Sequence, residues 1–299
     1  MYRKMLVLLD GSKLAEVVFS YAQELSARLN INLELLHVCS PREEELLPMR
    51  QAYMEHMAEA LHNRVMKIRS KMGDKISSPK TETRGTVVVG YPAEEILKYA
   101  DKNNIDLIML STHGQSGIRA WDIGNVANKV IHASKLPVWL VPTELRQEII
   151  YDKLPKRTMV IPLDGSEFSE TVIPHAINIA KQRGAELEMV LIHVNEIPTT
   201  VNLVQVERQQ AEITAKKRYL SGIAKRVGEA GIKARAKLLR GDPAEAIVNY
   251  IENHPTQLVT LASHGHAGLS KMIFGSVTEN ILHLVKKTPI FVVRPGGLR

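Results

Sequence analysis

Short, continuous apolar runs alternate along the chain with longer stretches in which apolar residues recur every three or four positions. In the first half the runs are "MLVLL", "LELLHV", "TVVVG", "LIML" and "PVWLV". Uninterrupted runs of this length are typical of strands covered on both faces. Residues 14–29 carry one apolar stripe and predict a helix that Ser12 can cap. Strands that alternate with helices five times predict a parallel, doubly wound α/β sheet.

The second half of the chain repeats the first. Residues 90–114, "GYPAEEILKYADKNNIDLIMLSTHG", align without a gap on residues 241–265, "GDPAEAIVNYIENHPTQLVTLASHG". "LVLLDGS" at 6–12 likewise matches "VIPLDGS" at 160–166. A polar segment near 142–157 has no partner in the repeat, so we expect two tandem domains, 1–145 and 155–299. A long helix is predicted in each domain, at about 43–72 and 199–230.

Composition is that of a globular protein, with 44% hydrophobic and 24% charged residues among 299. The net charge of +7 comes from scattered Lys and Arg residues, and only 5% of residues are aromatic, which disfavours nucleic acid as a partner. Cys39 is the single cysteine, so no internal disulfide can form. No apolar stretch approaches the roughly 18 residues of a membrane span. We therefore expect a cytoplasmic protein.

The segment "SHGHAGLSKMIFGSVTEN" at 263–280 joins a predicted strand to a predicted helix. Ser276 and Glu279 have the spacing of a capping box, which by itself accounts for these two residues. It does not account for Gly265 at the exit of the strand or for Gly275 before the helix. Glycines at both places let backbone N–H groups face an anion at the positive end of a helix. A phosphate would fit there.

At this point the chain resembles the universal stress protein family. Residues 262–276 match that family's nucleotide-binding signature, except that Ala262 stands where the signature has its first glycine. "LDGS" after the first strand, "HV" at the end of the second and "PIFVV" as the fifth strengthen the resemblance, which spans both repeats. It implies five-stranded sheets of order 3-2-1-4-5, a site for ATP, ADP or AMP with Mg²⁺ as counterion, and domains that pair through their fifth strands. Such pairing would form an internal pseudo-dimer, and a homodimer of the whole chain is compatible with it.

The resemblance also implies which residues hold the nucleotide. In the second domain, Asp164 and the backbone of Val194 would hold the adenosine, and Gly265, Gly275 and Ser276 the ribose and phosphates. In the first domain the corresponding residues are Asp10, Val38, Gly114, Gly124 and Asn125.

The first domain departs further from the signature than the second. Its loop, "STHGQSGIRAWDIGN", has Ser111 in place of the first glycine and Asn125 in place of the serine, although Asn125 can still cap a helix. Asp122 replaces the apolar Ile273 and puts a carboxylate near the expected phosphate, beside the bulky Trp121. We therefore predict that the second domain is the principal nucleotide site.

Other interpretations of the same residues remain open. Asp10 and Asp164 could, with Ser12 and Ser166, only shape the turns that follow their strands. His37 and His193 are predicted to be core histidines, whereas His113 and His264 are expected to line the glycine loops without a catalytic role.

Several enzyme classes lack their motifs. The chain has no Walker loop, no G-x-G-x-x-G after the first strand, no G-x-S-x-G and no clustered zinc ligands. Two functions remain: a regulatory module that binds an adenine nucleotide with little or no turnover and alters contacts with a protein partner, and a slow ATPase or phosphotransfer enzyme using the same site. The first is favoured, because no residue near the loops is an obvious general base.

Overall fold

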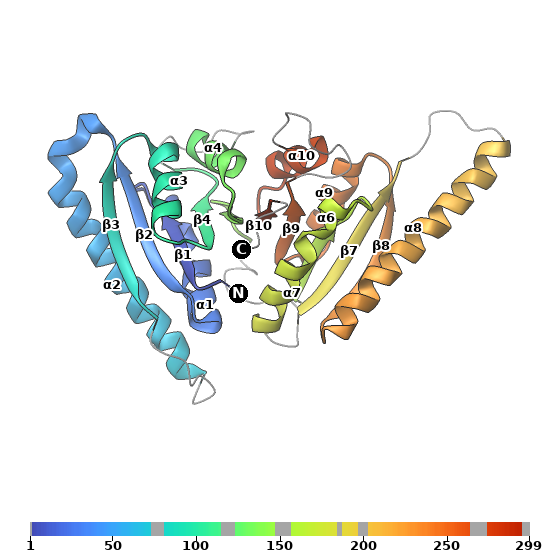
Figure 1. The fold of residues 1–299 in the computed structure, drawn as a ribbon, viewed down its shortest axis with the longest axis horizontal. Coiled ribbons are helices and arrows are strands. Elements are labelled where there is room, and N and C mark those ends of the chain that lie inside the picture. The colour runs from blue at the N-terminus through green and yellow to red at the C-terminus, as the bar shows by residue number, and fades with distance from the viewer. Residues whose placement is uncertain are drawn as a thin grey trace. The chain divides into compact units, whose positions relative to one another are not determined.

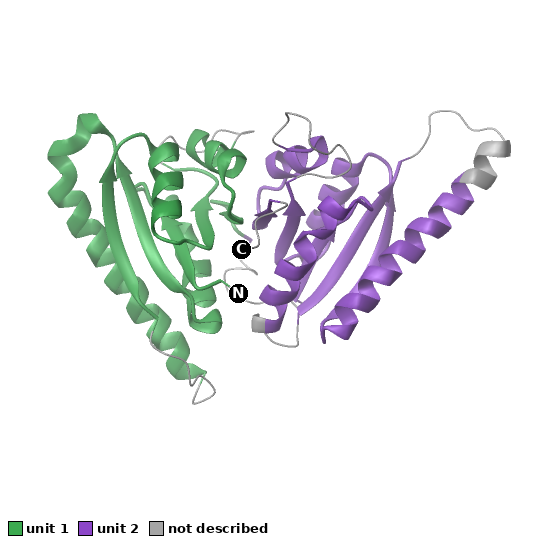
Figure 2. Ribbon diagram, viewed as in Figure 1, with its two compact units in different colours: residues 1–145 green, residues 146–299 purple. Residues whose placement is uncertain are grey.

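The computed structural model describes residues 2–72, 81–114, 123–146, 157–183, 187–196, 203–263 and 274–294. They belong to two compact units, residues 1–145 (unit 1) and 146–299 (unit 2), shown in Figure 2. Each unit has a parallel sheet flanked by helices (Figure 1). No helix in these described ranges is long and apolar enough to cross a membrane.

Unit 1 is built from the following elements: β1 (Lys4–Leu8), η1 (Ala15–Val18), α1 (Phe19–Leu29), β2 (Asn32–Cys39), η2 (Pro41–Leu46), α2 (Leu47–Lys71), β3 (Thr83–Val89), α3 (Pro92–Lys102), β4 (Leu107–Ser111), α4 (Asn125–Ala133) and β5 (Val138–Val141). Its strands lie in the order β3-β2-β1-β4-β5, and each pair is parallel. β1 is central, because Val7 is in register with Leu35 on β2 and with Met109 on β4.

Unit 2 repeats this plan with β6 (Arg157–Pro162), α6 (Glu167–Glu170), α7 (Val172–Arg183), β7 (Leu187–Asn195), α8 (Leu203–Glu229), β8 (Lys233–Arg240), α9 (Pro243–Asn253), β9 (Leu258–Ala262), α10 (Ser276–Leu284) and β10 (Ile290–Val293). Its strands lie in the order β8-β7-β6-β9-β10, all parallel. The predicted order 3-2-1-4-5 is therefore confirmed in both units.

Helices cover both faces of the unit 1 sheet. On β3, Gly85 lies against the backbone carbonyl of Met54 in α2, while the next residue, Thr86, accepts a hydrogen bond from the Tyr99 hydroxyl of α3 at 3.3 Å. Because successive side chains of a strand point to opposite faces, α2 and α3 lie on opposite sides of the sheet. This arrangement explains the unbroken apolar run of β1, where Met5, Leu6 and Val7 are fully buried.

The predicted apolar stripe on the first helix is also confirmed. Residues 15–18 form a 3₁₀ turn that continues directly into α1. Tyr21, Ala22, Leu25 and Leu29 of α1 are all buried. The helix ends at Asn30, which adopts a left-handed conformation with φ of 55°.

Candidate functional site

Two matching turns follow the first strand of each unit. Asp10 accepts a hydrogen bond from the backbone N–H of Ser12 at 2.9 Å. Asp164 accepts one from the N–H of Ser166 at 2.9 Å and another from the Ser166 hydroxyl at 2.6 Å. Gly11 and Gly165 lie between these partners with φ of 84° and 88°, in the left-handed region that favours glycine. The turn-shaping interpretation of both aspartates is thus confirmed for one oxygen of each carboxylate.

The serines of these turns also start the following helical segments. The Ser12 hydroxyl accepts from the N–H of Ala15 at 3.2 Å, and the Ser166 hydroxyl accepts from the N–H of Ser169 at 3.1 Å. Both hydroxyls therefore satisfy an N–H group that a helix start leaves without an intrahelical partner.

The helices after β4 and β9 begin differently from the prediction. Their N-caps are Gly124 and Gly275. Glycine has no side chain, so neither helix start is capped by a side-chain hydrogen bond. Asn125 and Ser276 are the first helical residues, so the capping box predicted from Ser276 and Glu279 is wrong, and so is the capping role of Asn125. The N–H of Glu279 instead donates to the Gly275 carbonyl at 3.0 Å, as in any first helical turn.

The glycines are explained by how closely the chain returns to its strand. The N–H of Gly124 donates to the Thr112 carbonyl at 2.8 Å, and that of Gly275 to the Ser263 carbonyl at 3.0 Å. A Cβ atom on Gly124 would lie 3.2 Å from the Thr112 oxygen, which is a tight contact. Each helix therefore starts at the end of the preceding strand, and its first residues line one cavity together with Asp10 or Asp164.

A cavity of about 430 Å³ lies at this place in unit 2. The predicted site residues that line it are Asp164, Val194, Ala262, Gly275 and Ser276. Gly265 and His264 lie outside the described residues. The cavity lies where the strand order reverses, at the carboxyl ends of the strands, the usual ligand position of a doubly wound sheet.

Unit 1 has a cavity of about 400 Å³ at the same position. All its predicted residues line it: Asp10, Val38, Gly114, Gly124 and Asn125. Ser111, which replaces the signature's first glycine, is buried and donates from its hydroxyl to the His113 carbonyl at 2.6 Å. Trp121 and Asp122 lie outside the described residues.

The structure adds residues to both cavities that the sequence patterns did not indicate. Arg50 of α2 lines the unit 1 cavity, and a Cβ atom on Gly11 would lie 2.6 Å from its Nη1. Lys216 of α8 lines the unit 2 cavity and donates to Asn195 Oδ1 at 2.8 Å. Thr278 of α10 lines it too and donates to the Ala262 carbonyl at 3.0 Å. Arg50 and Lys216 stand on long helices whose sequence spacing does not indicate the cavity, whereas Thr278 stands on the helix whose start is already predicted to lie there.

His37 and His193 are buried, as predicted. The Nδ1 atom of His37 lies 3.0 Å from the Leu9 carbonyl oxygen, which can only accept, so Nδ1 carries the proton. Burial lowers the pKa of His37 below its ordinary value of 6.5, and the bond to Leu9 partly opposes this shift. The His37 imidazole is therefore neutral at neutral pH.

A family model described as "Universal stress protein family" matches residues 1–142 and 156–294. The chain belongs to this family. Because the model matches twice, once in each repeat, the chain is a tandem universal stress protein. Its two cavities lie at corresponding positions in the two domains.

Relatives and solved structures agree with this assignment. A universal stress protein of Mycobacterium tuberculosis strain H37Rv is 23% identical over 297 residues, covering 95% of this chain and 95% of that protein. One from Methanocaldococcus jannaschii is 30% identical over 147 residues, covering 46% of this chain and 82% of that protein. The crystal structure of a universal stress protein from Archaeoglobus fulgidus covers 97% of this chain and 96% of its own, with a TM-score of 0.65 and 20% identity. That structure shares the fold.

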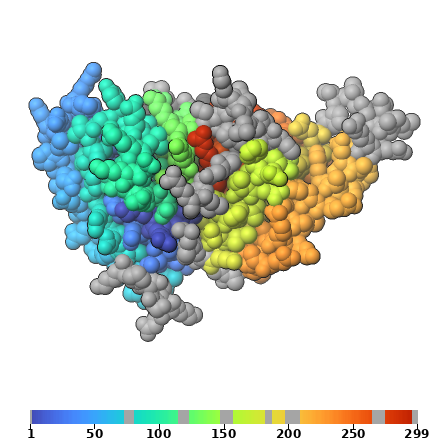
Figure 3. Space-filling model, in the orientation of Figure 1, coloured from blue at the N-terminus to red at the C-terminus, as the bar shows by residue number. Residues whose placement is uncertain are grey.

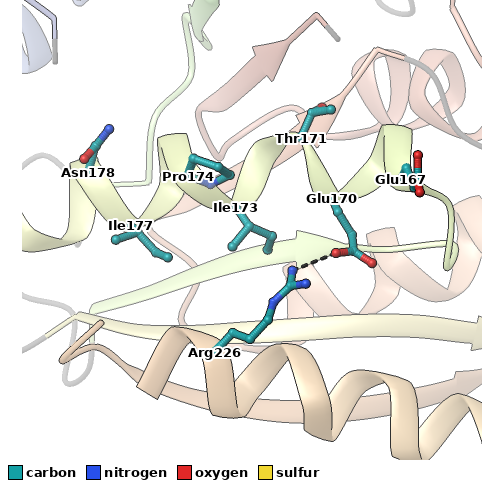
Figure 4. Close-up of a pocket in the computed structure, with 8 residues that line it drawn as sticks. All are labelled: Glu167, Glu170, Thr171, Ile173, Pro174, Ile177, Asn178 and Arg226. Atoms are coloured by element: carbon teal, nitrogen blue, oxygen red, sulfur yellow. Dashed lines mark hydrogen bonds and ion pairs between the residues drawn. The ribbon is translucent and has the colours of Figure 1, made fainter. Parts of the chain in front are cut away.

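A third hollow of this universal stress protein, of about 590 Å³, lies in unit 2 away from both glycine caps (Figure 4). Ile173, Pro174 and Ile177 of α7 line it, and an ion pair of 2.7 Å between Glu170 and Arg226 bridges α6 and α8 across it. The Arg226 side chain is 56% exposed, so solvent screens this pair. None of the predicted site residues lines this hollow.

Proposed function

We propose that this tandem universal stress protein is a stress-response regulatory module that binds an adenine nucleotide, in the first place ATP, with little or no turnover. One observation carries the proposal: in each unit, the aspartate of an Asp-Gly-Ser turn and the glycine at which a helix starts line the same cavity. The glycine leaves the first N–H groups of the helix without a side-chain cap, and such groups bind phosphate.

The chemistry of the unit 2 cavity supports this ligand class. Ile192, Ile247, Leu261 and Ile281 line it and offer an apolar surface to a purine ring. Asp164 offers a carboxylate that can accept hydrogen bonds from the ribose hydroxyls, and the Val194 backbone borders the same space. The α10 start, at Gly275 and Ser276, then provides the place for the phosphates, with Mg²⁺ as their counterion.

We further propose unit 2 as the principal site. The loop of unit 1 has Ser111 and Asn125 where the signature has glycine and serine, and Asp122 adds a negative charge to the loop. A carboxylate near the phosphates raises the free energy of a bound triphosphate. Unit 2 departs from the signature at Ala262 only.

The alternative function is a slow ATPase or phosphotransfer enzyme at the same site. Catalysis needs a general base within hydrogen-bond reach of the attacking group. One oxygen of the Asp164 carboxylate accepts from Ser166, and among the residues that the structure describes Glu196 is the other carboxylate lining the cavity. Glu196 follows β7, and β7 is separated from β9 by β6, which places the ends of these strands roughly 10 Å apart. Because α10 starts at the end of β9, this strand spacing sets Glu196 apart from the α10 start, which favours binding over turnover.

Isothermal titration of the full chain with ATP tests the proposal. We expect about one strong site per chain, abolished by Gly275→Val and largely unaffected by the matched change Gly124→Val, each variant being checked for folding by circular dichroism. Two equal sites, or loss of binding with Gly124→Val alone, would reverse the assignment of the principal site. Mass spectrometry of small molecules released from the purified protein identifies the nucleotide.

Phosphate release separates the two functions. A fully occupied protein that released phosphate at roughly 1 to 1000 per second, the usual range of enzymes, would make it an ATPase. A chain that neither carries nor binds any adenine nucleotide would contradict both functions. A cytoplasmic location stays a prediction from the sequence.

A further inference from the structure

Exposed large apolar side chains are concentrated on unit 1. In the described part of the chain they are Leu46, Met49, Val89, Tyr91, Val126 and Leu284, and only Leu284 belongs to unit 2. Tyr91 is 71% exposed and Met49 57%. Side chains of this size are normally buried at least in part, so their grouping at one place needs a physical reason.

Four of these residues lie on the two segments that follow the carboxyl ends of the neighbouring strands β2 and β3. Leu46 and Met49 lie at the start of α2, whereas Val89 and Tyr91 lie at the end of β3. The two segments are tied together through Cys39 of β2: Cys39 is in register with Val89, and its thiol donates to the Glu43 carbonyl of η2 at 3.2 Å. In Figure 3, the blue surface of α2 adjoins the teal surface that follows β3. We call Leu46, Met49, Val89 and Tyr91 the unit 1 rim.

The repeat shows that folding does not require this rim. Val89 and Tyr91 correspond to Arg240 and Asp242 in unit 2. Asp242 caps α9, since its side chain accepts the N–H of Glu245 at 3.0 Å. Tyr91 holds the same N-cap position before α3 and makes no side-chain cap. A residue at an N-cap that accepts no hydrogen bond from the helix N–H groups is less favourable than aspartate or serine.

The charges in the two segments that carry the rim are mostly negative, although the whole chain has a net charge of +7. Glu43, Glu44 and Glu45 precede Leu46 and are exposed, and Glu94 is exposed in the first turn after Tyr91. The one cation within residues 41–49 and 89–95 is Arg42, and the next residue after them, Arg50, lines the cavity. An apolar surface framed by carboxylates is complementary to a basic partner that carries apolar side chains.

We propose that the unit 1 rim is the docking surface for a basic, amphipathic segment of another protein. Tyr91 and Met49 are the apolar anchors, because large aromatic and flexible side chains contribute most of the free energy of such contacts. The four glutamates attract the basic face of the segment and repel polyanions such as nucleic acid. Glu43 and Val126 line the unit 1 cavity as well, so the docked segment lies beside that cavity. This proposal does not depend on which nucleotide binds.

Fluorescence anisotropy with a labelled helical peptide of Leu and Lys in amphipathic spacing tests the proposal on the full chain. Tyr91→Ser removes the aromatic anchor and supplies a capping hydroxyl, so we expect binding about tenfold weaker with a melting temperature that is unchanged or higher. The pair Glu44→Lys and Glu45→Lys should weaken binding and flatten its dependence on salt. Leu284→Ser, at the exposed apolar residue of unit 2, is the control and should bind as the wild type does.

Three results would overturn the proposal. In the first, the basic peptide does not bind. In the second, a peptide of Leu and Glu with the same spacing binds as tightly as the basic peptide, and in the third Leu284→Ser weakens binding as much as Tyr91→Ser does. A concentration-dependent dimer in sedimentation that Tyr91→Ser abolishes would instead assign the rim to a second copy of the chain. ATP titration of Tyr91→Ser serves as a separate control, since the proposed nucleotide site should be unaffected.

Discussion

The carboxylate of Asp10, after β1, lies directly against the α-carbon of Gly114, after β4. A Cβ atom on Gly114 would overlap Oδ2 of Asp10, while Oδ1 of the same carboxylate accepts the N–H of Ser12. The carboxylate is therefore fixed on both sides. A side chain at residue 114 would therefore have to displace the Asp10 carboxylate.

Replacing Gly114 by alanine should destabilise unit 1 by about 1 to 3 kcal/mol, as overpacking does elsewhere. In an Asp10→Ala background the same change should cost less than about 1 kcal/mol, because the overlapping carboxylate is gone. Urea unfolding followed by tryptophan fluorescence measures this, since Trp121 and Trp139 are the only two tryptophans and both lie in residues 1–145. Strictly additive costs of the two changes would contradict the contact.

The crossing of α2 over β3 should be sensitive to one methyl group. Gly85 lies so close to the Met54 carbonyl of α2 that a Cβ atom would overlap it. We expect Gly85→Ala to lower the free energy of unfolding of unit 1 by about 1 to 3 kcal/mol, so that the tryptophan transition occurs at lower urea. Ala236 occupies the corresponding position in unit 2 and is exposed. Ala236→Gly is the matched control and should leave the tryptophan transition unchanged; an equal shift in both variants would refute the close crossing.

Unit 1 should lose stability as the pH falls through the ordinary pKa of histidine. Burial lowers the pKa of His37 in the folded protein, so below pH 6.5 the unfolded chain binds a proton that the folded chain does not. The free energy of unfolding therefore decreases with decreasing pH. His37→Asn keeps a donor for the Leu9 carbonyl but does not titrate, and its unfolding free energy should depend less on pH. Identical pH dependence in wild type and variant would show that His37 does not contribute.

Pairing of the two repeats through their fifth strands is a prediction from the family resemblance. β5 and β10 end the strand order of their units and read "VWLV" and "IFVV", apolar throughout, and strands at a sheet edge need cover. A protease site inserted between residues 147 and 156 of the full chain allows the link to be cut. The halves should still co-elute in size-exclusion chromatography. Halves that separate at once would contradict the pairing.

The sequence by itself determined the fold of each unit. Apolar runs and helical periods locate the strands and helices, because covered parallel strands need continuous apolar residues and covered helices need a stripe. The repeat predicted two domains, and the family resemblance selected residues that, apart from Gly265 outside the described ranges, line one cavity in each unit. These features depend on local pattern or on backbone constraints such as the left-handed Gly11 and Gly165.

Only the tertiary structure decided how the helix starts at the site and which residues from other helices line the cavity. The Ser276 and Glu279 spacing predicts a capping box, but Gly275 becomes the N-cap because its N–H is held by the Ser263 carbonyl at the end of β9. Arg50 and Lys216 line the cavities from long helices. In the local sequence, these two cations cannot be told apart from cations on a solvent-exposed helix face. Such contacts join residues that are far apart in the chain. They form only when two elements lie at the right distance from each other, and the spacing of side chains along one element does not determine that distance.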